Sequence, residues 1–140
     1  MDTHMDGAHF TLAVDGFEDE AASRAERVNE DIGGHALAAW LSERLTAKGH
    51  AGSRPWVEDH GWAFDISHEG RVYLCTCSID ESEPGPREAH VSIDLMRGLK
   101  DRLFGRNRMA GDDRVVAAVR DLLASDGRLR IKETVGAELR

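Results

Sequence analysis

Apolar and polar residues alternate along several parts of the chain, a pattern typical of strands with one buried face. In the segment 8–14, Phe10, Leu12 and Val14 share one side of the predicted strand. Three further strands are predicted, with buried sets Trp62, Phe64, Ile66; Val72, Leu74, Thr76; and Val91, Ile93, Leu95. Turn-forming residues separate these strands at 67–70 and 81–86, and the first turn is short enough for a hairpin. The predicted sheet is therefore antiparallel.

Three segments have the spacing of three and four residues that places apolar side chains on one face of a helix. They lie within 35–48, 95–104 and 113–124, and Asp112 or Asp113 can cap the third. Their apolar positions are Leu37, Trp40, Leu41, Leu45; Leu95, Met96, Leu99, Leu103; and Val115, Val116, Val119, Leu122, Leu123. Each stripe must be buried against another apolar layer, and the sheet is the available one.

These elements predict an α+β fold with an antiparallel sheet of about five strands packed against two or three amphipathic helices. The order is roughly β-α-β-β-β-α-α-β, and Leu129 and Ile131 belong to the last strand. The segment 15–31 carries seven acids and few large apolar residues, which favours an exposed loop or a loosely docked helix. We expect one domain over 1–140, with flexibility in the first few residues and in 15–32.

The net charge and the lengths of the apolar runs indicate which kinds of partner are unlikely. The 140 residues include 18 Lys and Arg against 26 Asp and Glu, a formal net charge of -8 that makes nucleic acid an unlikely partner. No apolar run approaches the ~20 residues that cross a bilayer, and the first 30 residues do not have the pattern of a signal peptide. We expect a bacterial cytoplasmic protein without a membrane partner.

The densest cluster of polar and aromatic residues is the string Trp56-Val57-Glu58-Asp59-His60-Gly61-Trp62. Two carboxylates and a histidine can bind a ligand or exchange protons, and an indole face can stack on a ring. In the alternative interpretation, which we favour, Trp62 belongs to the core and the acids solvate a hairpin turn. The string resembles a Glu-Asp-x-Gly-Trp pattern in small bacterial proteins, a resemblance that covers about the first half of the chain. It implies no activity and no catalytic residue.

Two further groups invite a catalytic interpretation. Cys75 and Cys77 lie on one face of a strand at a spacing that suits neither a disulfide nor a structural zinc site, so we predict free, buried thiols. His90, Ser92 and Asp94 also share a face, but side chains two apart on a strand are ~7 Å apart, too far for a triad unless they lean together or the third member comes from elsewhere. We favour a solvent-exposed strand face here.

A basic stretch interrupts the acidic chain: Arg97, Lys100, Arg102, Arg106 and Arg108, with Asp101 among them. It can pair with an acidic patch of the same chain, of a second subunit or of another partner, or it can be a solvated helix face. No phosphate loop, nucleophile elbow, zinc-protease motif or dinucleotide fingerprint occurs.

The sequence therefore predicts a non-enzymatic binding or protein-interaction module. The alternative is a small enzyme or ligand sensor that uses the acidic turn or the Cys and His residues of the sheet. We predict no catalytic residue, metal ligand or cofactor, and a protein partner or self-association. The predicted ligand- or partner-binding residues are Trp56, Glu58, Asp59, His60, Trp62, Arg97, Lys100 and Arg102.

Overall fold

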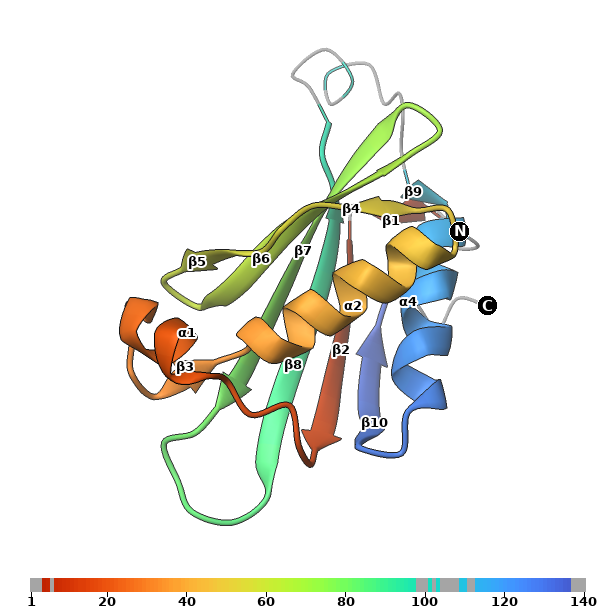
Figure 1. Cartoon of the computed structure of the whole chain (residues 1–140). Helices are drawn as coiled ribbons and strands as arrows, with labels where there is room; N and C mark the ends of the chain where they lie inside the picture. The colour runs from red at the N-terminus through yellow and green to blue at the C-terminus, as the bar shows by residue number, and fades with distance from the viewer. Residues whose placement is uncertain are drawn as a thin grey trace.

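The fold is a large antiparallel sheet with helices packed on one side (Figure 1). The computed structural model describes residues 4–5, 7–97, 101, 103, 109–110 and 113–136. Its elements are β1 (His4–Met5), β2 (Gly7–Val14), α1 (Ala21–Glu26), β3 (Ile32–Gly33), α2 (His35–Ala47), β4 (Ala51–Gly52), β5 (Trp56–Glu58), β6 (Gly61–His68), β7 (Arg71–Asp80), β8 (Arg87–Leu95), β9 (Met109–Ala110), α4 (Arg114–Ser125) and β10 (Leu129–Val135). The predicted α+β class is confirmed.

The main sheet has eight strands rather than about five. Its order is β10-β2-β8-β7-β6-β4, with β3 paired to β7 and β5 paired to β6, and β1 and β9 form a separate two-stranded sheet. All of these pairs are antiparallel. The strands that the sequence did not predict are two or three residues long, too short for an alternating pattern to register.

The side chains of β7 face the opposite way from the prediction. Tyr73, Cys75 and Cys77 are buried, while Val72 is exposed and Leu74 is half-buried. Both alternating sets of this strand contain apolar residues, so hydropathy alone does not distinguish the two faces, and a shift of one residue exchanges them. Both cysteines are free and buried, as predicted.

The core lies between the sheet and the helices α2 and α4. Most of the predicted stripes form the buried faces: Leu37, Leu41 and Leu45 on α2, and Val115, Val116, Val119, Leu122 and Leu123 on α4. Trp40, also predicted for the α2 stripe, is only partly buried at the margin of the core, edge-on to Phe17. They pack against the inward side chains of the sheet, which include Phe10, Leu12, Phe64, Ile66, Val91 and Ile93. Each large apolar side chain that is fully buried stabilises the fold by roughly 1.5–3 kcal/mol, so these stripes fix both helices on one face.

Asp113 caps α4 and connects it to β7. One carboxylate oxygen accepts from the backbone N–H groups of Val115 and Val116, at 2.9 and 3.0 Å. The other accepts from the Tyr73 hydroxyl at 2.7 Å. Burial, and then the Asp113 carboxylate, raise the pKa of Tyr73, so this phenol remains a hydrogen-bond donor.

The helix predicted over 95–104 lies largely outside the described residues. In the described part, β8 continues to Leu95 as a strand, and Leu95 itself is buried in the core. No helix among the residues that the structure describes is long and apolar enough to span a bilayer.

Candidate functional site

The face of the sheet opposite α2 and α4 has no helix packed on it in the described chain (Figure 1). We call it the uncovered face. Strand alternation and register place on it Trp56, Glu58, Ala63, Asp65, Val72, Leu74, Thr76, Ser78, Asp80, Glu88, His90, Ser92, Asp94, His9, Thr11, Ala13, Arg130 and Glu133. Most of the central side chains are small or polar and only half-buried.

A chain of five hydrogen-bonded side chains runs across this face. Ser92 Oγ lies 2.9 Å from His9 Nδ1, and His9 Nε2 lies 3.1 Å from His90 Nδ1. His90 Nε2 is 3.2 Å from Glu88 Oε1, and the second oxygen of Glu88 accepts from Lys132 Nζ at 2.9 Å. The chain joins β8, β2 and β10, because the register places Ser92 opposite His9.

The sequence singled out His90, Ser92 and Asp94 but missed the contact that forms. His9, from β2, supplies the imidazole beside Ser92. A serine nucleophile needs such a base, but it also needs donors for an oxyanion and walls that hold a substrate. Neither Ser92 nor His9 lines the groove at the end of β2 or the groove beside α2.

The predicted acidic turn is divided between the core and the surface. Trp56 and Glu58 lie on the uncovered face, where the indole Nε1 donates to Glu58 Oε1 at 3.0 Å. Trp62 is only 3% exposed and packs edge-on against His35, with ring centroids 4.6 Å apart. Asp59 and His60 are exposed in the turn between β5 and β6. Two of these five residues therefore join the uncovered face, whereas Trp62 belongs to the core.

The predicted basic site is described only at its start. The Arg97 guanidinium donates to the backbone oxygen of Asp101 at 3.0 Å. Lys100 and Arg102 lie outside the described residues, so their predicted role in partner binding stays a prediction.

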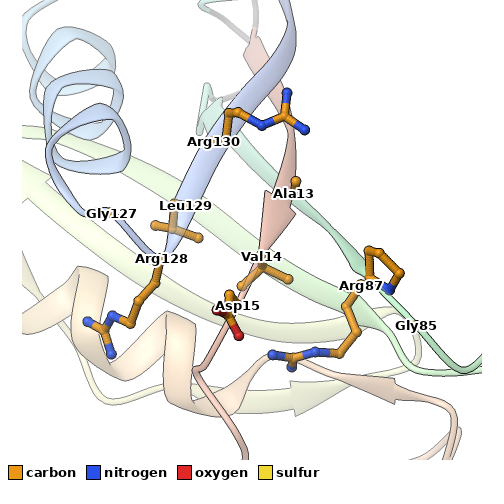
Figure 2. A pocket seen from close by; sticks show the side chains of 10 residues that line it. Ala13, Val14, Asp15, Gly85, Arg87, Gly127, Arg128, Leu129 and Arg130 are labelled. Atoms are coloured by element: carbon orange, nitrogen blue, oxygen red, sulfur yellow. The ribbon is translucent and has the colours of Figure 1, made fainter.

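A groove of about 570 Å³ lies at one end of the sheet, between the 85–87 loop, the end of β2 and the start of β10 (Figure 2). Arg87, Arg128 and Arg130 line it, which suggests an anion site. However, Arg87 already pairs with Glu18 at 3.0 Å and Arg128 with Asp126 at 2.8 Å. A second groove, of about 640 Å³, runs between α2 and the 52–55 segment and is lined by both charge signs. Two of the three arginines of the first groove are therefore already paired with carboxylates.

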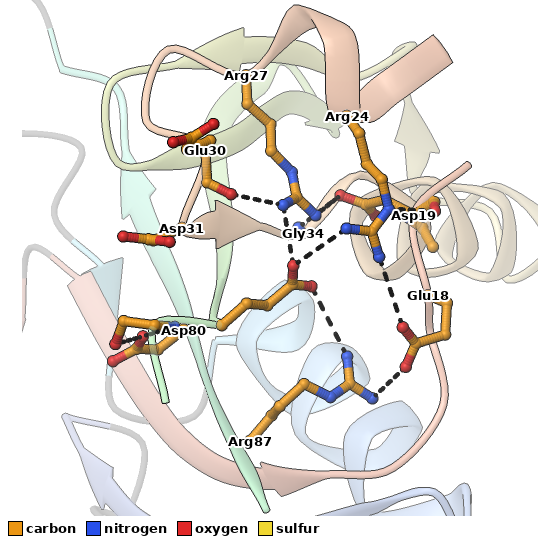
Figure 3. A network of polar contacts seen from close by, with 12 residues as sticks. Glu18, Asp19, Arg24, Arg27, Glu30, Asp31, Gly34, Asp80 and Arg87 are labelled. Atoms are coloured by element: carbon orange, nitrogen blue, oxygen red, sulfur yellow. Dashed lines mark hydrogen bonds and ion pairs between the residues drawn. The ribbon is translucent and has the colours of Figure 1, made fainter. Parts of the chain in front are cut away.

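The acidic segment 15–31 is anchored by a buried ion-pair network (Figure 3). The side chains of Arg27 and Asp19 are 3% and 1% exposed and lie 3.0 Å apart. Arg27 also donates to Glu81 at 2.9 Å, and Asp19 accepts from the backbone N–H groups of Gly34 and Ala36 at the start of α2. The sequence predicts an exposed loop or a loosely docked helix here. The segment contains the short helix α1, and pairing among Asp19, Arg27 and the distant Glu81 buries these charged groups.

Ionisation of Asp19 is favoured despite its burial. Desolvation alone would raise its pKa, but the N–H groups of Ala36 and Gly34, together with Arg27, outweigh it and hold the pKa below the ordinary value. The carboxylate therefore stays charged and keeps α1 and the start of α2 together.

Besides His9 and His90, a second pair of histidines lies in contact, near the hairpin between β6 and β7. His50 Nδ1 and His68 Nδ1 are 3.0 Å apart, between the end of α2 and the end of β6. Burial, and then the neighbouring His68, lower the pKa of His50. Only one proton fits between the two nitrogens, so the folded state disfavours a proton on His50.

We expect the protein to lose stability as the pH falls from about 7 to about 5, because the unfolded His50 takes up a proton near pH 6.5 and the folded one resists it. The folded state then binds fewer protons than the unfolded state, so stability rises with pH across this window. Urea unfolding at several pH values measures the effect. His50→Gln should flatten the slope, and an unchanged slope in that variant would refute the assignment.

Comparison with protein-family models, with curated proteins and with solved structures found no match. The resemblance to small bacterial proteins with the Glu-Asp-x-Gly-Trp pattern therefore stays a prediction. Within the part of the chain that the structure describes, no group of three or more His, Cys, Asp or Glu side chains is arranged to hold a metal ion.

Proposed function

We propose that this protein is a non-enzymatic interaction module that docks a partner protein on the uncovered face, and that the partner presents a basic surface. The observation that carries the proposal is a sheet whose helices, in the described chain, cover one side only. Six neighbouring strands carry this face, in the order β5-β6-β7-β8-β2-β10. At ~4.8 Å between neighbours, their five spacings give a width of about 24 Å. That width suits one side of a standard protein interface.

Charge identifies the partner's chemistry. Six carboxylates belong to the uncovered face: Glu58, Asp65, Asp80, Glu88, Asp94 and Glu133. The basic side chains described on it are Arg130 and Lys132, both from β10, and Lys132 is already paired with Glu88. A partner with clustered Lys or Arg would be attracted, whereas nucleic acid and a second copy of the same face would be repelled.

Apolar side chains at the margins supply contact area. Trp56 is 38% exposed, and Val72 and Val135 are also exposed on this face. Exposed aromatic residues are common anchors of protein interfaces. A polar centre with apolar margins favours a reversible partner over a permanent one.

The second candidate is a small enzyme, favoured by the contact between Ser92 and His9. A fluorophosphonate probe distinguishes the two functions: labelling of Ser92 that His9→Gln abolishes would support the enzyme. Cytoplasmic location and the absence of a cofactor stay predictions.

Two measurements test the interaction module. A photo-cross-linking residue at Thr76, in the middle of the uncovered face, should capture a basic protein from bacterial lysate, and the same residue at the exposed Glu43 of α2 should not. The purified partner should then bind the double variant Glu58→Lys/Asp65→Lys at least tenfold more weakly than wild type.

The matched control carries the same change of charge on the helix side. Glu43→Lys/Asp121→Lys alters exposed residues of α2 and α4 and should leave the affinity unchanged. Equal losses in the two double variants would contradict the proposal, as would a cross-link from position 76 only to another copy of this chain.

A further inference from the structure

His9 and His90 lie near the centre of the uncovered face with their rings turned toward each other. Their ring centroids are 5.2 Å apart, and His9 Nε2 is 3.1 Å from His90 Nδ1. We propose that these two nitrogens form a binding site for one divalent transition-metal ion that prefers imidazole, such as Zn²⁺ or Cu²⁺. This inference does not depend on the proposed partner.

The distance fits two nitrogens that share one ion. At the usual metal–nitrogen length of 2.0–2.1 Å, two imidazole ligands are about 2.9 Å apart at a right angle and about 3.3 Å apart at the tetrahedral angle. The observed 3.1 Å lies between these values. An ion can therefore enter without a large movement of either strand.

The outer nitrogen of each ring already has the partner that a metal-bound histidine needs. His9 Nδ1 can donate to Ser92 Oγ, and His90 Nε2 can donate to the Glu88 carboxylate. With both outer nitrogens protonated, the inner nitrogens each present a lone pair to the space between them. Contacts of this kind hold ligand histidines in orientation and raise their basicity, and Lys132 in turn holds Glu88.

The site is accessible and incomplete. The His90 side chain is 38% exposed, so an ion can reach it from solvent. Two protein ligands leave at least two coordination positions for water or for the side chain of a bound partner, which agrees with the absence of any three-ligand group among the described residues. Acidic neighbours on the same face, Asp94 and Glu133, favour a cation.

The pair His50 and His68 is the obvious competitor, because its nitrogens are also 3.0 Å apart. His68 is less accessible, at 20% side-chain exposure. The charges around His50 are mixed, because the acids Asp113 and Glu69 act on it as well as the cation of Lys48, so accessibility is the clearer difference between the two pairs. The two pairs therefore serve as an internal comparison.

Calorimetric titration of the full chain with Zn²⁺, and separately with Cu²⁺, tests the site. We expect one ion per chain in the wild type, binding at least tenfold weaker in His9→Gln and in His90→Gln, and unchanged binding in His68→Gln and in His60→Gln, an exposed histidine outside both pairs. Glu88→Gln should weaken binding about tenfold or more while leaving both ligands in place.

Circular dichroism checks that each variant is folded. Wild-type affinity in His90→Gln, loss of binding in His68→Gln alone, or no binding to the wild type would each overturn the proposal. Since no partner protein is present, the outcome is separate from that of the cross-linking experiment.

Discussion

Replacing Arg27 by methionine is expected to lower the free energy of unfolding by about 3–5 kcal/mol, the usual cost of removing one partner from a buried ion pair. The Arg27 side chain is 3% exposed and contacts Asp19 and Glu81. Without it, the buried Asp19 loses its ion-pair partner, and Glu81 keeps only the longer contacts to Arg24 and Arg87, at 3.7 and 3.9 Å. Urea denaturation at neutral pH measures the loss.

Arg24 provides the matched control. It pairs with Glu18 and Glu81 at 3.7 Å in each case, but its side chain is 46% exposed. Arg24→Met should cost less than about 1 kcal/mol, because exposed ion pairs contribute little. The loss of unfolding free energy in Arg27→Lys should lie between those of Arg24→Met and Arg27→Met, since a single ammonium does not reproduce the two-pronged hydrogen bonding of a guanidinium. If Arg27→Met and Arg24→Met cost the same, the network does not stabilise the fold as we describe.

Sequence periodicity predicted the long elements well, for a physical reason. A helix such as α4 has one buried stripe and one exposed face, so its apolar residues recur at a fixed period. The strands β2 and β8 have one face in the core and one uncovered, which produces clean alternation. Where both alternating sets are apolar, as in β7, the same reasoning assigned the wrong face.

The candidate site was much less predictable, because it depends on which strands are neighbours. His9 and His90 are 81 residues apart and meet only because β2 lies beside β8 in one particular register. A shift of one residue would turn either side chain to the other face. The sequence does show that both histidines are polar residues within strands of alternating pattern. With the correct order of the strands, the two would have been predicted to lie close together.

The buried ion-pair network around Arg27 was hard to predict for the same reason, because it depends on contacts between distant segments. Asp19 and Arg27 lie in a segment rich in acids, which on composition alone indicates solvent exposure. Glu81, the second carboxylate that pairs with Arg27, comes from the loop after β7. Long-range pairing of this kind has no local pattern, so it becomes visible only when the strands are assembled.

Gly34→Ala is expected to lower the free energy of unfolding by at least about 2 kcal/mol, through backbone strain and displaced neighbours together. Gly34 precedes α2 with a φ of 135°, which L side chains rarely adopt, and an added Cβ would lie 2.5 Å from the backbone oxygen of Cys77. That oxygen belongs to β7 in the middle of the sheet, so it cannot move aside. Movement of Gly34 would instead weaken its N–H bond to Asp19.

Gly49→Ala separates strain from contact. Gly49 also has a positive φ, of 94°, but an added Cβ there would meet nothing within 4 Å. It should cost only the strain of a left-handed residue, about 1–2 kcal/mol. Thermal and urea unfolding should therefore show that Gly34→Ala is clearly less stable than Gly49→Ala. Equal losses would mean that the start of α2 can shift away from Cys77, and that the close approach of α2 to β7 does not fix the helix on the sheet.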